Sequence, residues 1–352
     1  MKNSILGIIG GGQLGRMTVL AAARLGIKCY VYDPNPDSPA FQVCAKSFIK
    51  DFDDEESIKE FASNIDAALY EFENIPINTA RIIEKFTKLR PSSKVLSISQ
   101  DRLVEKTFLT EQAGVNTAKY FQINNVNDLS KALRSFGGTG ILKTRKLGYD
   151  GKGQIKIDGN KNIDSIFNSL NSHELILEKI VPFNRELSII IARDIKGNIK
   201  IYDCVENIHK NHILDITIAP APGLQAEVSE SAKSIAIKIA ESINLTGLLA
   251  IELFELDNHK LLVNEIAPRP HNSGHWTMDG CITDQFEQAA RAALGLNLGS
   301  VKRIFDIKMK NLIGSDVKLV KDYINEPNYK IHLYGKKDIR QGRKMGHVNQ
   351  II

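Results

Sequence analysis

Short apolar segments alternate with helix-forming segments along the first seventy residues, and this alternation limits the fold more than any other feature of the sequence. The apolar segments Ile5–Ile9, Lys28–Tyr32 and Ala67–Tyr70 predict strands, and Arg16–Leu25 and Glu55–Ala62 predict helices between them. Strands that alternate with helices form a parallel sheet that helices cover on both faces. We therefore predict an α/β protein whose N-terminal domain is doubly wound and Rossmann-like.

The turn after the first predicted strand is rich in glycine. Gly10–Gly15 matches the G-x-G-x-x-G pattern of dinucleotide-binding domains, and Asp33 follows the second strand, where those domains bind a ribose. Such a turn lets a phosphate approach the N-terminus of the following helix. A single match is a weak signal, because many doubly wound domains keep the tight turn without binding NAD. An NAD-dependent oxidoreductase is therefore an alternative that the later motifs disfavour.

The chain has 352 residues, more than one ordinary hydrophobic core accommodates. The pattern changes near Gln100, where we predict a helix over Asp101–Ala113 with Gly114 as its C-terminal cap. The last fifty residues predict a small third module with a strand near Lys308–Ile313. We divide the chain into domains of residues 1–100, 101–296 and 297–352.

A second glycine-rich loop follows a strand predicted to begin at Ile141. The segment KTRKLGYDGKGQ, Lys143 to Gln154, carries three glycines, at 148, 151 and 153, behind a strand that ends in lysine. Backbone N–H groups of such a loop bind phosphates, and the lysine adds positive charge. The segment is not a Walker A sequence, and an exposed glycine-rich hairpin turn is an equal alternative on loop chemistry alone.

Two glutamates interrupt neighbouring apolar runs, LLAIELF with Glu252 and LLVNEIA with Glu265. A hairpin turn centred between Asn258 and His259 places them directly opposite each other on one face of the sheet. Two carboxylates so placed repel, and a bound divalent cation such as Mg²⁺, which prefers oxygen ligands, resolves the repulsion. The alternative is that one glutamate faces solvent or pairs with an arginine, as after a one-residue slip in register.

The loop after these strands, APRPHNSGHWT, crowds Arg269, His271, Asn272, Ser273 and His275 among prolines and a glycine. A polar loop beside a predicted metal site is a candidate anion and substrate site. The two histidines have the i, i+4 spacing of some zinc sites, but the prolines and the glycine disfavour the helix that such a site requires.

Three further charged residues are weaker candidates. Lys106 lies on a predicted helix and is otherwise surface charge. Glu71 and Glu73 follow the strand Ala67–Tyr70, at the edge of a parallel sheet where ligands bind, and are otherwise ordinary loop carboxylates.

The composition excludes several classes of protein. The net charge is +5 and the positive residues are scattered, so no nucleic-acid partner is expected. The four cysteines form no C-x-x-C pair, which disfavours a disulfide framework and favours a reducing compartment. The N-terminal apolar run of five residues is too short for a signal peptide, and no run approaches the ~20 apolar residues of a membrane helix. We expect a cytoplasmic protein with no membrane partner.

Taken in order, these segments resemble the ATP-grasp superfamily, and more closely its 5-(carboxyamino)imidazole ribonucleotide synthase family. The resemblance runs from residue 5 to residue 348 and rests on IIGGGQLGRM, EFENIP, QDRLVEK, KTRKLGYDGKGQ, LEKIVPFNRELS, VENIHKNHIL, NEIAPRPHNSGHWT, DQFEQAARAALGL, LIGSDV and GRKMGH. It implies a three-domain ATP-grasp ligase of purine biosynthesis with ATP and Mg²⁺ as cofactors. ATP would phosphorylate bicarbonate to carboxyphosphate, and the exocyclic amine of 5-aminoimidazole ribonucleotide would then be carboxylated. The likeness also implies a homodimer.

The resemblance assigns an ATP site residue by residue. Lys143 would contact the phosphates, the glycine-rich loop would close over them, and Glu186 would bind the ribose. Glu252 and Glu265 would bind Mg²⁺. The whole ATP set that the resemblance implies is Arg102, Lys106, Lys143, Gly148, Tyr149, Asp150, Gly151, Lys152, Gly153, Gln154, the adenine hinge Glu178, Lys179, Ile180 and Val181, then Glu186, His209, Asn264 and Glu265.

The resemblance also assigns a substrate site. Lys336 and Arg343 would bind the ribose phosphate, because arginine offers a fork to two oxygens and lysine a point charge. The implied substrate-binding residues are Glu73, Asp150, Arg269, His271, Asn272, Lys336 and Arg343, of which Asp150, Arg269, His271 and Asn272 would be catalytic.

The sequence departs from the family pattern at its end. The chain stops at GHVNQII, about one helix before family members do, so the C-terminal module is either naturally short or truncated. Another ATP-grasp ligase of purine metabolism, such as a formate-dependent transformylase, is the main functional alternative. A catalytically inactive nucleotide-binding regulator is disfavoured, because Lys143, the glycine-rich loop, Glu252 and Glu265 are all present.

Overall fold

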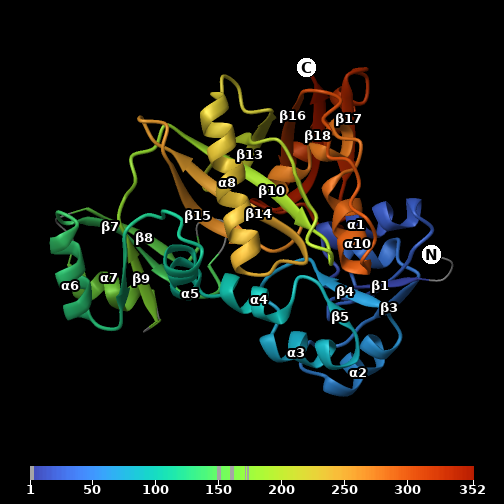
Figure 1. The fold of residues 1–352 in the computed structure, drawn as a ribbon, viewed down its shortest axis with the longest axis horizontal. Coiled ribbons are helices and arrows are strands. Elements are labelled where there is room, and N and C mark those ends of the chain that lie inside the picture. The colour runs from blue at the N-terminus through green and yellow to red at the C-terminus, as the bar shows by residue number, and fades with distance from the viewer. Residues whose placement is uncertain (1–3, 149–151, 159–161, 171, 173) are drawn as a thin grey trace.

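The computed structural model describes residues 4–148, 152–158, 162–170, 172 and 174–352. The described residues form three sheets (Figure 1). In this view the N-terminal sheet lies at the lower right, a small sheet at the left, and a large sheet between and above them.

The N-terminal sheet is parallel, with strand order β3-β2-β1-β4-β5. Its strands are β1 (Ile5–Ile9), β2 (Lys28–Tyr32), β3 (Lys46–Phe48), β4 (Ala67–Tyr70) and β5 (Lys88–Leu89). The helices of this region are α1 (Gln13–Arg24), α2 (Glu55–Ser63) and α3 (Ile77–Phe86). The structure therefore confirms the predicted doubly wound, Rossmann-like fold.

One helix that packs on this sheet comes from far along the chain. Helix α10 (Gln285–Leu294) contacts α1, β1 and β4. Its residues Ala289, Ala290 and Ala293 share a hydrophobic core with Leu6 and Ile8 of β1. The N-terminal domain and the rest of the chain are therefore joined by a common apolar core.

The small sheet is antiparallel, with strand order β6-β9-β7-β8. Its strands are β6 (Tyr120–Ile123), β7 (Thr139–Thr144), β8 (Gln154–Asp158) and β9 (Leu175–Glu178), and helices α6 (Val126–Ser135) and α7 (Ile163–Ser169) pack with it. Strands β7 and β8 flank the predicted phosphate loop, so that loop is the connection of a hairpin.

The large sheet has the strand order β15-β14-β10-β12-β13-β16-β18-β17, with β11 paired to β10. Its strands are β10 (Arg185–Arg193), β11 (Ile199–Ile201), β12 (Val205–Lys210), β13 (Ile213–Ala219), β14 (Gly247–Glu255), β15 (Leu261–Ala267), β16 (Ile307–Ile313), β17 (Tyr329–Leu333) and β18 (Lys344–Ile351). Helix α8 (Ala226–Ser242) packs against β10 and β15.

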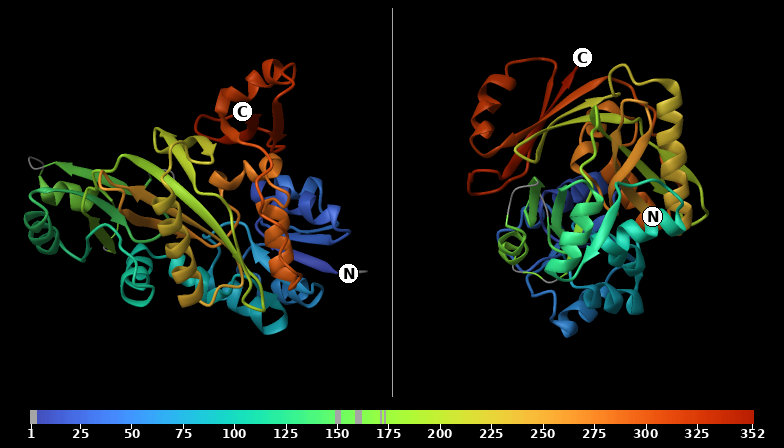
Figure 2. Two further views of the ribbon diagram at one scale, coloured as in Figure 1. Left: turned by 45° about the horizontal axis from the view of Figure 1, so that its top comes forward. Right: turned by 90° about the vertical axis from the view of Figure 1, so that its left-hand side faces the viewer.

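The C-terminal strands do not form a sheet of their own. Strand β16 pairs with β13, so β16, β18 and β17 extend the large sheet (Figure 2). Residues 297–352 were expected to be a small separate module, whereas the backbone hydrogen bonds of the sheet continue across residue 296. The proposed boundaries at residues 100 and 296 remain predictions.

Short helices connect β5 of the N-terminal sheet to β6 of the small sheet. These are α4 (Ser93–Ser99), α5 (Arg102–Thr107) and the π-helical turn η2 (Phe108–Gln112), and Gly114 has the positive φ of 62° that a C-terminal cap requires. The remaining short elements are the 3₁₀ turns η1 (Pro39–Gln42), η3 (Asn272–Gly274) and η4 (Gly314–Leu319), with α9 (Thr277–Gly280) and α11 (Val320–Tyr323). Within the described ranges, no helix is long and apolar enough to span a membrane.

Candidate active site

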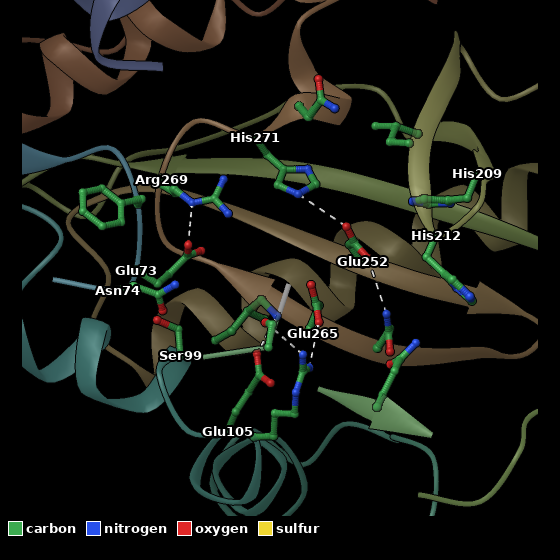
Figure 3. Close-up of a pocket in the computed structure, with 18 of the residues that line it drawn as sticks. Glu73, Asn74, Ser99, Glu105, His209, His212, Glu252, Glu265, Arg269 and His271 are labelled. Atoms are coloured by element: carbon green, nitrogen blue, oxygen red, sulfur yellow. Dashed lines mark hydrogen bonds and ion pairs between the residues drawn. The ribbon is translucent and has the colours of Figure 1, made fainter. Parts of the chain in front are cut away.

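A cavity of about 1010 Å³ lies where the three sheets meet (Figure 3). Typical ligand pockets measure roughly 300–1,000 Å³, so this one can hold a nucleotide together with a second ligand. The N-terminal sheet contributes the loop after β4, the small sheet contributes β7 and β8, and the large sheet contributes β10, β12, β14 and β15.

The centre of the cavity holds the predicted glutamate pair. Glu252 of β14 and Glu265 of β15 are direct partners in the antiparallel ladder. The pairing is confirmed, but the turn does not produce it. Between the turn and the site, the register is Glu255 with Leu261 and Leu253 with Val263, one residue away from the predicted one. A β-bulge at Asn264 adds one residue to β15 and brings Glu265 opposite Glu252.

The two carboxylates of the pair have different electrostatic surroundings. Burial and then the charge of Glu265 raise the pKa of Glu252 to about 7. Burial also opposes ionisation of Glu265, but Arg102 and Lys143 outweigh it and lower the pKa of Glu265 below its ordinary value. The Arg102 guanidinium lies 3.2 Å from the Glu265 carboxylate. Glu265 is therefore ionised, whereas Glu252 loses its proton only near pH 7. A cation bound between them would favour the ionised form of Glu252 as well.

The donor set of this pair suits Mg²⁺. Two carboxylates and the side-chain oxygen of Asn264 are hard oxygen ligands, and the Asn264 amide nitrogen lies 3.4 Å from Glu252. Among the described residues, no group of three or more histidine, cysteine, aspartate or glutamate side chains forms a metal site. Proteins commonly hold Mg²⁺ with one or two carboxylates and complete its coordination with substrate phosphates and water.

Helix α5 holds the strand segment that carries Glu265. A carboxyl oxygen of Glu105 accepts a hydrogen bond from the Ile266 N–H at 2.7 Å, and the Lys106 ammonium donates to the Asn264 carbonyl at 2.8 Å. These two side chains satisfy the backbone groups on either side of Glu265, as a neighbouring strand would. Lys106 is 2% exposed, so the surface-charge alternative for this residue is wrong.

A buried ion-pair group lies beneath the end of the cavity that Lys143 lines. The Lys143 ammonium is 3.0 Å from the Glu178 carboxylate, and the Lys106 ammonium is 3.6 Å from it. Burial opposes ionisation of Glu178, but the two lysines outweigh it and lower its pKa to about 2. Burial lowers the pKa of Lys143 despite the attraction of Glu178. The Glu178 side chain therefore faces lysines, and the adenine hinge of Glu178, Lys179, Ile180 and Val181 remains a prediction.

The described part of the glycine-rich loop contacts helix α5. Arg102 donates to the Gly148 carbonyl at 3.2 Å, and the Thr144 N–H donates to the Gly153 carbonyl at 2.8 Å. Arg145 forms two hydrogen bonds to the Asp101 carboxylate, of 3.0 and 2.6 Å, which fix the start of α5 to the end of β7. The predicted site residues Tyr149, Asp150 and Gly151 lie outside the described residues.

The opposite end of the cavity holds the predicted substrate loop. The Arg269 Nε lies 2.8 Å from the Glu73 carboxylate, and the His271 Nε2 lies 3.4 Å from Glu252. Burial and then Arg269 lower the pKa of His271 well below its ordinary value, so its imidazole is neutral. Both amide atoms of Asn272 are buried, and neither has a hydrogen-bond partner among the described residues. An unpartnered buried amide beside an arginine suits a small ligand with both donors and acceptors.

The N-terminal glycine turn is filled by the protein's own carboxylates. Glu71 accepts from the N–H groups of Gly12 at 2.5 Å and Gly15 at 2.7 Å, and Asp33 accepts from the Gly11 N–H at 2.7 Å. A dinucleotide phosphate requires these same N–H groups. The geometry therefore contradicts the NAD alternative. Glu71 is a structural carboxylate of the loop, as one of the two interpretations predicted, because it accepts hydrogen bonds from the glycine turn.

Three family models match the chain. The Ribonucleotide synthetase preATP-grasp domain matches residues 1–100, the ATP-grasp domain matches residues 108–286, and the Phosphoribosylaminoimidazole carboxylase C-terminal domain matches residues 308–352. The N5-carboxyaminoimidazole ribonucleotide synthase of Brucella melitensis biotype 1 is 43% identical over 350 residues, covering 99% of this chain and 96% of that protein. The chain belongs to the N5-carboxyaminoimidazole ribonucleotide synthase family.

Solved structures of the synthase family have the same fold. An ADP complex of an N5-carboxyaminoimidazole ribonucleotide synthetase superposes with a TM-score of 0.95 at 39% identity, covering 99% of this chain and 93% of that one. An Aspergillus clavatus synthase in complex with ADP and 5-aminoimidazole ribonucleotide superposes with a TM-score of 0.90 at 28% identity, covering 100% and 95%. The predicted ATP-grasp architecture is therefore confirmed.

The synthase fold gathers most, but not all, of the predicted site residues in the cavity. Those that line it are Glu73, Arg102, Lys143, Gly148, Gln154, Glu186, His209, Glu252, Asn264, Glu265, Arg269, His271 and Asn272. Lys106 and Glu178 are buried beneath it. The described site residues that do not line it are Lys152, Gly153, Lys179, Ile180, Val181, Lys336 and Arg343.

Several residues with a place in the site escaped prediction from the sequence. Glu105 lies between Arg102 and Lys106 in QDRLVEK, and its burial depends on β15, which is distant in the chain. Phe183 and Phe254 stack with ring centroids 4.6 Å apart at the cavity wall. Gln285 accepts from the His271 N–H and donates to the His271 carbonyl, both at 2.8 Å.

Proposed function

We propose that this protein is an ATP-dependent carbon–nitrogen ligase that carboxylates 5-aminoimidazole ribonucleotide with bicarbonate, giving 5-(carboxyamino)imidazole ribonucleotide, ADP and phosphate. The observation that carries the proposal is that the Glu252–Glu265 pair and the loop from Arg269 to Asn272 open into one cavity. One end offers the charges that a metal–nucleotide complex requires, and the other offers groups that bind a small anion. The Aspergillus clavatus synthase binds ADP and 5-aminoimidazole ribonucleotide in one complex, which supports the proposal that this protein binds a nucleotide and the same ribonucleotide.

The nucleotide end follows from the placement of the cations. Lys143 and Arg102 would bind the phosphates beneath the loop from Gly148 to Gln154. The predicted residues of that loop, from Tyr149 to Gly153, would add further contacts to the phosphates. Glu186 and His209, whose carboxylate and Nδ1 lie 2.7 Å apart, would face the ribose. Ile141 and Phe254 add apolar surface to the cavity wall, which suits an adenine ring. The predicted hinge of Glu178, Lys179, Ile180 and Val181 would bind the edge of that ring.

The metal proposal rests on the coupled carboxylates. Glu252 and Glu265 would hold Mg²⁺, with Asn264 beside them. The cation, when bound, neutralises negative charge on the transferring phosphoryl group. Lys143 and Arg102 supply further positive charge from the protein. The clamp, meaning the hydrogen bonds of Glu105 to the Ile266 N–H and of Lys106 to the Asn264 carbonyl, holds Glu265 in position.

The carboxylation end follows from Arg269, His271 and Asn272. A bicarbonate oxygen would attack the γ-phosphorus of ATP, ADP would leave, and carboxyphosphate would form. The amine of the imidazole would then attack the carboxyl carbon, or the CO₂ that carboxyphosphate releases, and phosphate would leave. Arg269 and the Asn272 amide would bind the anion. Glu73 orients Arg269, and the predicted role of Asp150 remains a prediction.

The ribose phosphate site is proposed at the connection between β17 and β18. The charges of Arg343 and Glu71 both act on the Lys336 ammonium. Burial, and then repulsion by Arg343, lower the pKa of Lys336 to about 8, although Glu71 opposes the change. Gln42 donates to the Gly335 carbonyl at 2.8 Å, and Lys337 pairs with Asp37. These contacts fix the connection against the N-terminal domain, beside the glycine turn.

Further parts of the proposal rest on the family likeness and the composition. We propose a homodimer and a cytoplasmic location on these grounds. The formate-dependent transformylase is not favoured, because the relatives are named for carboxylation of the imidazole amine.

The direct test is ADP release in the presence of ATP, Mg²⁺ and bicarbonate, with and without 5-aminoimidazole ribonucleotide. We expect the ribonucleotide to stimulate release strongly. No stimulation would contradict the assignment, and stimulation only when formate replaces bicarbonate would favour the transformylase.

A further inference from the structure

A buried line of hydrogen bonds leads from His271 across the large sheet. His271 Nδ1 is 2.8 Å from the Ser273 hydroxyl, which is 2.7 Å from the Ser188 hydroxyl of β10. The Asn207 amide nitrogen of β12 lies 2.9 Å from Ser188, and the Thr217 hydroxyl of β13 lies 2.9 Å from the Asn207 amide oxygen. Ser188, Thr217 and Ser273 are 0% exposed and Asn207 is 6% exposed.

The hydrogen bonds of this line have one direction. The Ser273 backbone N–H, which can only donate, is aimed at His271 Nδ1 at 3.3 Å. Nδ1 therefore accepts and carries no proton, and the Ser273 hydroxyl also donates to it. Ser273 then accepts from Ser188, Ser188 accepts from the Asn207 amide N–H, and Thr217 donates to the Asn207 oxygen.

The far side of the ring faces the cavity. With Nδ1 as an acceptor, the neutral imidazole carries its proton on Nε2. Nε2 lies 3.4 Å from a carboxyl oxygen of Glu252, and His271 lines the cavity beside the Asn272 amide, which has no hydrogen-bond partner within the described part of the chain. A proton on Nε2 therefore points toward the oxygens of Glu252.

We propose that Thr217, Asn207, Ser188 and Ser273 are positioning residues that hold His271 as its Nε2–H tautomer, so that His271 donates a hydrogen bond into the cavity and does not act there as a base. The consequence for catalysis rests on the function proposed above. His271 then stabilises negative charge on the bicarbonate or its phosphorylated form, and the proton of the imidazole amine leaves by another group.

The sharpest variant is Asn207→Asp, which keeps the shape of the side chain and removes its donor. Burial raises the pKa of the new carboxyl, so the variant is studied above that pKa, where the ionised side chain only accepts. The Ser188 hydroxyl then turns to donate to it, and the Ser273 hydroxyl turns to donate to Ser188. The Ser273 oxygen, 2.8 Å from Nδ1 of His271, then becomes an acceptor, and the only donor left at Nδ1 among the described residues is the Ser273 N–H at the longer distance of 3.3 Å. The proton therefore shifts toward Nδ1. The matched control is Asn311→Asp, the same change at a residue of β16 that is 0% exposed and donates to the Leu214 carbonyl, away from this line.

The readout is the tautomer itself, measured by long-range ¹H–¹⁵N correlation in protein labelled with ¹⁵N-histidine. The chain has eight histidines, and the His271→Gln variant assigns the signal. We expect an Nε2–H pattern in the wild type and in Asn311→Asp, and a shift toward Nδ1–H in Asn207→Asp. We also expect kcat to fall about 10- to 100-fold in Asn207→Asp, the usual effect of losing an outer partner of a functional histidine, with little change in the Kd for ADP.

A milder pair of variants covers a failure of Asn207→Asp to fold. Thr217→Val removes the donor that orients the Asn207 amide and should mix the two tautomers, and Thr217→Ser should restore the wild-type pattern. An Nδ1–H pattern in the wild type, or a wild-type pattern in the folded Asn207→Asp or Thr217→Val protein, overturns the proposal. Because the spectrum needs no turnover, a failure of the proposed reaction would leave this result readable.

Discussion

Glu252 and Glu265 lie opposite each other because Asn264 forms a β-bulge between them and the hairpin turn. In the uninterrupted register of the turn, Asn264 would lie opposite Glu252 and Glu265 would point to the other face of the sheet. The bulge therefore creates the acidic pair, and the side chains of Glu105 and Lys106 hold the backbone on either side of it.

The first prediction concerns the ionised member of the pair. Glu265→Gln should lower kcat by more than about 100-fold, the scale seen when one group that stabilises transition-state charge is removed. Thermal unfolding should show a folded protein, because removing one of two facing carboxylates relieves repulsion. Near wild-type turnover by this variant would contradict the metal-pair account.

The second prediction concerns the clamp. Glu105→Ala leaves the buried Ile266 N–H without its acceptor and should cost about 1–3 kcal/mol of unfolding free energy. Glu105→Gln keeps an acceptor oxygen and should cost less. Urea unfolding of the two variants checks this order, and equal losses would show that the hydrogen bond to Ile266 is not what matters.

The third prediction concerns pH. Burial, and then the charge of Glu265, raise the pKa of Glu105 to about 8. Between pH 4.5 and about 8 the folded protein keeps a proton on Glu105 that the unfolded chain has lost, so this group makes stability fall as pH rises, by at most about 1.4 kcal/mol per unit. Glu105→Gln should flatten the fall in the unfolding free energy across that window. An unchanged slope would mean that Glu105 ionises normally.

The fourth prediction concerns the substrate phosphate. Lys336→Met should raise the KM for 5-aminoimidazole ribonucleotide about 10- to 100-fold, since a hydrogen bond to a charged group contributes about 1.5–3 kcal/mol. The corresponding nucleoside, which lacks the phosphate, should be used equally poorly by both proteins. If the variant also lost activity toward the nucleoside, Lys336 would act elsewhere than at the phosphate.

The sequence predicted the features that local patterns encode. The strands β1, β2 and β4 have the predicted bounds, and the Glu252–Glu265 pairing was predicted although the bulge was not. What the sequence missed depends on contacts between distant segments. Glu105 acquires its role from β15, α10 packs on a sheet formed some 200 residues earlier, and β16 joins β13 across the expected domain boundary. From the sequence, Glu71 was either a weak ligand candidate or an ordinary loop carboxylate, and only the fold shows that it accepts hydrogen bonds from the glycine turn.

The central claim is that ATP phosphorylates bicarbonate in the cavity between the Glu252–Glu265 pair and Arg269. The most direct measurement is the isotopic content of the phosphate product when the reaction contains ¹⁸O-labelled bicarbonate, ATP, Mg²⁺ and 5-aminoimidazole ribonucleotide. The account predicts phosphate that carries one oxygen from bicarbonate, because the bond between that oxygen and phosphorus survives when the carboxyl group leaves. Phosphate without label, formed together with the carboxylated product, would contradict it.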